Sequence, residues 1–200
     1  DIESVRFGDG TEVTFTSTDS EEFQVNTYIQ GHQEQPSMAG LTDGGYVVAW
    51  ESHNQDGSGD GVFAQRYGAS GEPLGDEFQV NTWTGNEQER AEVTGLENGG
   101  FFITWQDSSG SNNQIGGGES WDVRGQLYNA SGVAQGPEVL INTQTYNDQT
   151  GPEVTALADG GYVVTWHSRY QDTGSSDYGI YGQRYDANGT PSGSEFRVNT

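Results

Sequence analysis

Residues 35–50 read QPSMAGLTDGGYVVAW, and related stretches recur at residues 90–105 (RAEVTGLENGGFFITW) and 151–166 (GPEVTALADGGYVVTW). Each copy is followed by a polar loop, a V/I-x-x-Q-x-Y segment and an EFQVNT-like segment. The matched tryptophans Trp50, Trp105 and Trp166 are separated by 55 and 61 residues. A period of this length indicates one supersecondary unit used several times. Such a unit cannot bury its apolar faces alone, so the copies are expected to stack against one another.

Each unit contains four strand signals. The first two are joined by a DGG or NGG turn, which supplies the positive φ values that tight hairpins require. The second signal is apolar on both faces, which indicates a strand covered from two sides. The expected strands are, in order, residues 37–41, 46–50, 62–67 and 77–81 in the first unit, 92–96, 101–105, 123–128 and 138–142 in the second, and 153–157, 162–166, 180–185 and 195–199 in the third.

The N-terminal region contains part of a further unit. Residues 4–7 resemble the third strand signal, and residues 22–27 are another EFQVNT-like segment. We therefore predict a single repeat domain over residues 1–200, divided into a partial unit (1–27) and three repeats (28–82, 83–143 and 144–200). The predicted fold is all-β, with four-stranded antiparallel units that resemble the blades of a β-propeller. A β-trefoil and a row of small β-sandwiches are the alternatives.

The composition excludes several classes of function. The formal net charge is −23, and all seven positive side chains are arginines. Nucleic acid and anionic membranes require a basic surface, so neither is an expected partner. Divalent cations, neutral sugars and cationic partners stay open. The chain has no cysteine, which excludes disulfides and zinc–thiolate sites, and no apolar run long enough to cross a bilayer.

A calcium site is the first candidate chemistry. In an antiparallel unit, the loops after the second and fourth strands lie at the same end, and these are the variable, acidic segments on which binding residues concentrate. Asp56, Ser58 and Asp60 place oxygen ligands at alternating positions, as the first half of a calcium loop does. Asp172, Ser175 and Asp177 form a looser version. The alternative is a solvated acidic loop without an ion.

A carbohydrate site is the second candidate. Aromatic rings stack on the apolar faces of sugars while nearby amides and carboxylates bind the hydroxyl groups. The candidate binding residues on the variable loops are Trp83, Trp121, Tyr146, Tyr170 and Tyr178. The alternative is that these rings fold back onto the rim of the core.

Catalysis is the third possibility. Paired carboxylates can run a glycosidase, but the chain has 30 acidic residues, so pairs arise by chance. The sequence contains no nucleophile elbow, phosphate-binding loop or dinucleotide-binding motif. From this reasoning the predicted catalytic set is empty and the chain is not expected to be an enzyme.

The best-matched segments, Asp159–Trp166, Gly179–Gly189 and Glu195–Thr200, resemble the tandem repeats of very large secreted bacterial proteins. That family includes RTX-type, calcium-associated adhesins and surface proteins. The middle unit departs from the pattern, with Asn98 in the turn and Leu127 where the other units have arginine. The resemblance implies secretion or a bacterial cell-surface location and use of Ca²⁺.

Together these observations lead to one main expectation and two alternatives. The main expectation is a non-catalytic extracellular module for adhesion or structural assembly, stabilised by calcium. Its expected partners are an extracellular glycan or other copies of the same protein. A lectin-like carbohydrate-binding domain that uses the variable loops is the first alternative, and a glycoside hydrolase is the second.

Overall fold

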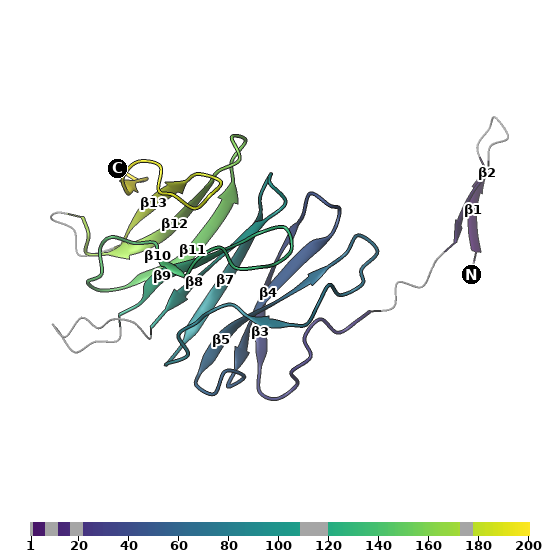
Figure 1. Ribbon diagram of the computed structural model, residues 1–200, viewed down its shortest axis with the longest axis horizontal. Coiled ribbons are helices and arrows are strands. Elements are labelled where there is room, and N and C mark those ends of the chain that lie inside the picture. Colours follow the sequence, from purple (N-terminus) through teal and green to yellow (C-terminus); the bar gives the residue numbers. More distant parts are fainter. Residues whose placement is uncertain (1, 7–11, 17–21, 109–119, 173–177) are drawn as a thin grey trace.

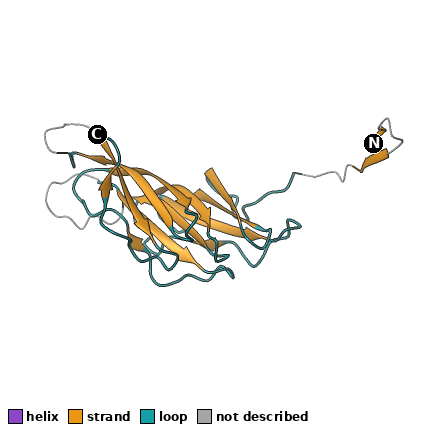
Figure 2. Ribbon diagram, turned by 90° about the horizontal axis from the view of Figure 1, so that it is seen from above, coloured by secondary structure: helices purple, strands orange, loops and turns teal. Residues whose placement is uncertain are grey.

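The structure is a computed structural model, and it describes residues 2–6, 12–16, 22–108, 120–172 and 178–200. Within these ranges the regular secondary structure is entirely β, as Figure 2 shows. No described segment forms a helix long and apolar enough to cross a membrane.

Three four-stranded antiparallel sheets, in chain order, make up the body of the molecule (Figure 1). The first contains β3 (Gln33–Gly40), β4 (Tyr46–His53), β5 (Asp60–Tyr67) and β6 (Phe78–Gln79). The second contains β7 (Gln88–Gly95), β8 (Phe101–Asp107), β9 (Asp122–Tyr128) and β10 (Val139–Leu140). The third contains β11 (Gln149–Ala156), β12 (Tyr162–Arg169), β13 (Tyr178–Tyr185) and β14 (Phe196–Arg197). A separate hairpin of β1 (Ile2–Arg6) and β2 (Glu12–Thr16) lies apart from them (Figure 1).

The hairpin between the first two strands of each sheet depends on the DGG or NGG turn. Its central glycine has a φ of 85° at Gly44, 84° at Gly99 and 86° at Gly160, a region that favours glycine. In the first turn, the side chain of Asp43 accepts a hydrogen bond from the amide of Gly45 at 2.9 Å. The same contact recurs in the other two turns. The turn therefore sets the register of the hairpin identically in all three units.

A stacked pair of aromatic rings joins the second and third strands of each sheet. The ring centroids of Tyr46 and Tyr67, which are directly opposed in the register, are 4.9 Å apart. The equivalent pairs, Phe101 with Tyr128 and Tyr162 with Tyr185, have centroids 4.8 and 5.0 Å apart. Each such cross-strand pair stabilises its sheet by roughly 0.5–1 kcal/mol.

Polar side chains repeated in every unit hold the turns and loops. The amide of Gln65 donates to the carbonyls of Arg66 and Gly75, and Gln126 and Gln183 make the equivalent bonds. The repeated glutamine thus has the same structural role in all three units. Asn81 and Asn142 accept hydrogen bonds from the amides of Val62 and Val123.

The core lies between the sheets. One face of the first sheet, which carries Val47 and Val62, packs against the face of the second that carries Ile103 and Trp105. A second cluster joins the second and third sheets in the same way, around Val123, Val164 and Trp166. The first strands β3, β7 and β11 lie side by side, with β7 between the other two. The described sheets form an open stack and do not close into a ring, so the propeller arrangement is not established.

Trp105 provides a test of this stacked core. It is fully buried between the first and second sheets, whereas Trp83 is 55% exposed. We expect Trp105→Ala to lower the free energy of unfolding by about 3–5 kcal/mol, because it removes a large apolar side chain and leaves a cavity. Urea denaturation measures the change. Trp83→Ala is the matched control and should change stability by less than about 0.5 kcal/mol. Equal losses in the two variants would contradict the assignment of the core.

Candidate functional site

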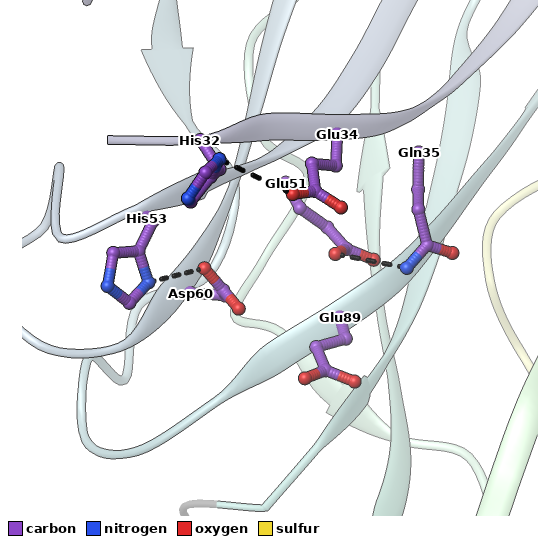
Figure 3. Close-up of a pocket in the computed structure, with 7 residues that line it drawn as sticks. All are labelled: His32, Glu34, Gln35, Glu51, His53, Asp60 and Glu89. Carbon is purple, nitrogen blue, oxygen red and sulfur yellow. Dashed lines mark hydrogen bonds and ion pairs between the residues drawn. The ribbon is translucent and has the colours of Figure 1, made fainter. Parts of the chain in front are cut away.

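An acidic pocket of about 200 Å³ lies where the first and second sheets meet, at the end that carries the loops after the second and fourth strands. Figure 3 shows the carboxylates of Glu34, Glu51, Asp60 and Glu89 facing a common space. The remaining lining residues are His32, Gln35 and His53. We call this set of seven residues the acidic pocket.

The pocket depends on a bulge near the start of each first strand. The pairing of β3 with β4 shifts between Glu34 and Ser37, and Gln35, inside this shift, has a φ of 48°. Equivalent shifts occur in β7 at Arg90, with a φ of 54°, and in β11 at Gly151, with a φ of 60°. A bulge turns its backbone amide out of the strand ladder, where it needs another partner.

The residue after the repeated tryptophan of the preceding sheet supplies that partner. Glu51, which follows Trp50, accepts a hydrogen bond from the amide of Arg90. Gln106, which follows Trp105, accepts one from the amide of Gly151 at 3.1 Å. A glutamine oxygen therefore satisfies the same backbone donor, and the bulge does not require a carboxylate at position 51.

Burial makes Glu51 an unusual carboxyl group. It is only 5% exposed, and its second oxygen accepts a hydrogen bond from Gln35 at 3.3 Å. Loss of solvation raises the pKa of Glu51 to about 7, helped by the negative charges of Glu89 and Asp60 and opposed by the hydrogen bond from Arg90. Near neutral pH this group therefore exists as both an acid and a base.

Glu89, on β7, experiences the same environment from the second sheet. Burial raises its pKa, and the charges of Asp60 and Glu87 act in the same direction. The amide of Gln106 donates to Glu89 at 3.1 Å, which opposes the shift. The pocket thus concentrates negative charge that the protein itself only partly compensates.

Asp60, at the start of β5, connects two parts of the site. One of its oxygens lies 2.9 Å from Nδ1 of His53, and its backbone amide donates to Glu87 at 2.7 Å. Carboxylate oxygens of Asp60, Glu87 and Glu89 all lie within 4.8 Å of one another. These three residues could hold a hard divalent cation, which prefers oxygen ligands.

The residues predicted to bind calcium have different partners in the structure. Asp60 belongs to the acidic pocket, whereas the oxygens of Asp56 accept hydrogen bonds from the amide of Ser58 and the side chain of Asn81. Asp172 pairs with Arg197 at 2.7 Å and accepts a bond from the Tyr181 hydroxyl. Ser175 and Asp177 lie outside the described residues.

The predicted sugar-binding aromatics lie on several segments. Tyr170 and Tyr178 lie around the guanidinium of Arg169, whose carbon is 4.8 and 5.9 Å from the two ring centroids. Both rings are exposed, as are Trp83 and Tyr146, while Trp121 is half-buried. Trp83 precedes Glu87 in the loop between β6 and β7, and it is the predicted aromatic nearest in sequence to the acidic pocket.

Sequence reasoning did not identify Glu51, Glu87 and Glu89 as candidates. A signal for Glu51 was present, because the position after the repeated tryptophan changes from Glu51 to Gln106 to His167 while its surroundings are kept. Because the residue at this position differs between the units while its neighbours stay similar, the fold does not require one particular side chain there. The partners of Glu51 could not be found in this way, since Glu89 belongs to the next unit.

The comparisons with known proteins give similarity at the level of structure. No family model matches the sequence, and no curated protein is significantly similar to it. The fold is similar to that of an endo-arabinase from Bacteroides thetaiotaomicron, with 14% identity and a TM-score of 0.44, over 84% of this chain and 56% of that chain. It is also similar to an endo-1,4-β-xylanase from the same organism, with 12% identity and a TM-score of 0.49, over 100% of this chain and 77% of that chain. The chain thus spans little more than half the length of the endo-arabinase, and these low values establish no residue correspondence.

Two sequence-based predictions are corrected by this finding. The expectations of a non-catalytic module for adhesion or structural assembly, and of a chain that is not an enzyme, are overturned, because both solved structures are named as enzymes. The physical reason for the error is that local motifs were taken as the mark of a catalytic site. The catalytic carboxylates of a glycosidase are defined by their separation in space, so they need not form a local sequence motif.

The raised pKa of Glu51 predicts a pH-dependent stability. Its folded pKa of about 7 lies above the unfolded value of 4.5, so the folded state binds more protons between these pH values and its stability falls as pH rises through them. Glu51→Gln keeps an acceptor for Arg90, as Gln106 does for Gly151, and removes the charge. We expect this variant to match the wild type at pH 4 and to exceed its unfolding free energy by roughly 2–3 kcal/mol at pH 8.

Chemical denaturation at the two pH values checks this prediction. Glu97→Gln is the matched control, because Glu97 is exposed and lies in the turn before β8. If Glu51→Gln were less stable than the wild type at pH 8, the carboxylate would be a structural group and the interpretation of the pocket would be wrong.

Proposed function

We propose that the acidic pocket is an acid–base site that hydrolyses glycosidic bonds. The observation that carries this proposal is a carboxyl group at Glu51 where the fold needs only the oxygen that Gln106 supplies in the next unit. A buried carboxylate beside other carboxylates destabilises the folded protein, so its presence favours a chemical role. Protons and ionised carboxylates in one pocket are what glycoside hydrolysis requires.

In this proposal, Glu51 is the proton donor. Its raised pKa keeps the carboxyl group protonated for a large fraction of the time near neutral pH. It donates this proton to the glycosidic oxygen as the bond from that oxygen to the anomeric carbon breaks. The leaving sugar departs as a neutral alcohol, and Glu51 is left as a carboxylate.

Asp60 is the proposed base. His53 holds its carboxylate through the 2.9 Å contact with Nδ1, while Glu87 binds the backbone amide of the same residue. Asp60 takes a proton from the water that attacks the anomeric carbon, and the oxygen of that water forms the new bond. Proton exchange with solvent then returns both carboxyl groups to their starting states.

A neutral polysaccharide is the proposed substrate class. The net charge of −23 disfavours an acidic polymer, and exposed rings lie on the loops at the same end as the pocket. Trp83, in the loop that also carries Glu87, offers a stacking surface for a sugar ring. We further propose that the three sheets are blades of a β-propeller, a fold built from four-stranded antiparallel sheets of this kind.

Divalent-cation binding is a second candidate function, favoured by a different observation. Oxygens of Asp60, Glu87 and Glu89 converge within 4.8 Å of one another, a spacing that one cation of the size of Ca²⁺ can bridge. A bound cation would also offset the repulsion that acts on Glu51 and Glu89. This function does not depend on hydrolysis, and its test is separate.

Hydrolysis is tested by the release of reducing sugar from neutral polysaccharides, including arabinan and xylan. We expect release by the wild type and a loss of about 10²–10⁴-fold in Glu51→Gln, because the proton donor is removed. The rate should fall as pH rises above about 7, where Glu51 loses its proton. Glu97→Gln should keep full activity. No release by the wild type from any polymer, or equal rates in Glu51→Gln and the wild type, would refute the proposal.

Cation binding is tested by thermal unfolding with calcium and with EDTA at matched ionic strength. We expect calcium to raise the melting temperature of the wild type, since a ligand that binds the folded state stabilises it. Glu87→Gln should abolish this rise by removing one ligand of the group. Asp56→Asn is the matched control, because Asp56 lies in the neighbouring loop outside the group. An equal rise in Glu87→Gln and the wild type would exclude these residues as the site.

A further inference from the structure

The third sheet has an apolar face that no other described segment covers. In the first sheet this face carries Val80, which is 2% exposed, and in the second it carries Ile141, which is 3% exposed. The equivalent residue of the third sheet, Val198, is 52% exposed. Val163 and Ile180 on the same face are only partly buried, although their equivalents in the first sheet are fully buried. We call the face that carries Val163, Ile180 and Val198 the open face.

The first sheet is also incompletely covered, on the opposite side. Met38 is 66% exposed, whereas the equivalent Val93 is 7% exposed because the first sheet packs on it. A groove of about 290 Å³ lies on this side, between the segment that contains Val25 and the side chains of Val48 and Trp50. We call this side, marked by Met38 and Trp50, the receiving face.

These two faces are the halves of an interface that the molecule already forms twice. At each internal junction, the residues equivalent to the open face pack against the residues equivalent to the receiving face. The two outer faces therefore carry the positions that already pack together at the internal junctions, and similar contacts are expected between them.

A polar contact marks the same junctions. The amide and hydroxyl of Thr82 donate to Glu138, both at 2.8 Å, and Thr143 makes the same pair of bonds to Glu195. Each bond runs from the end of a fourth strand to the following unit. At the receiving face, Thr27 makes these bonds to Glu77 at 2.7 and 3.1 Å.

We propose that the open face of one copy of this protein docks on the receiving face of a second copy, head to tail. A second copy is the expected partner because the docked pair would reproduce the two internal junctions position by position. Val198 would enter the place that Val25 holds, and Thr200 would replace Thr27 as the donor to Glu77. The segment of residues 22–27 is thereby exchanged for the third sheet of the partner.

Replacement of residues 22–27 by the third sheet of the partner is favourable because these residues cover the receiving face only in part. They contribute the partly buried Val25 to the cluster around Trp50 and Tyr67, and they leave Met38 exposed. A whole sheet from the partner would cover both Met38 and the cluster around Trp50 and Tyr67. The interface is heterologous, so each copy uses two different faces.

Sedimentation equilibrium of the full chain over a wide range of concentration tests the proposal. Added salt should strengthen the association, because each copy carries a charge of −23 and the copies repel one another. We expect a dimer at high concentration in moderate salt. Val198→Asp and Met38→Asp should each remove it without unfolding the monomer, since both side chains are exposed in the monomer.

A mixing experiment distinguishes this interface from a symmetric one. Val198→Asp retains an intact receiving face and Met38→Asp retains an intact open face, so a mixture of the two variants should associate where each alone does not. Val133→Asp is the control, because Val133 is 57% exposed in a turn of the second sheet, away from both faces. It should associate like the wild type.

Three outcomes would overturn the proposal. These are a wild type that stays monomeric at every concentration and salt level, variants that associate as well as the wild type, and a mixture that does not associate. None of these results depends on hydrolysis or on calcium, so the docking proposal fails or stands independently of the proposed function.

Discussion

Each of the three four-stranded sheets has apolar side chains on both of its faces, and this constraint governs the rest of the structure. A sheet of this kind is stable in water only between two neighbours, because the hydrophobic effect acts on both faces. Val47 and Trp50 lie on opposite faces of β4 and belong to different apolar clusters, one on each side of the first sheet. The stack, the position of the pocket and the two uncovered outer faces all follow from this requirement.

The acidic pocket lies at a junction and depends on it. Glu51 belongs to the first sheet and Glu89 to the second, and the amide of Arg90 connects the two. Packing of apolar surface therefore holds carboxylates at separations that their charges oppose. The energy that stabilises the stack maintains an arrangement that is unfavourable locally, as is common where ionisable groups are arranged for function.

Much of the fold could be predicted from the sequence because the same structural residues recur at matching positions in all three units. The glycine turn at Gly44, the tryptophan in the second strand and the glutamine at Gln65 each marked an element that the structure contains. The site was harder to predict. Its residues come from two units, and its geometry depends on bulges that carry no composition signal. Asp60 was found because it lies in a loop with oxygen side chains at alternating positions, whereas Glu89 precedes the expected strand at residues 92–96 and no motif marks it.

The bulge at Gln35, Arg90 and Gly151 has a consequence for how such a chain can change over time. Duplicating a unit adds a new junction, and each junction brings an outward-pointing amide together with the side chain that follows the tryptophan. Any acceptor at that position preserves the backbone contact, so the chemistry there can vary while the scaffold is maintained. Gene duplication in this architecture therefore multiplies places where new activity can arise, and each starts from a pocket wall that is already folded.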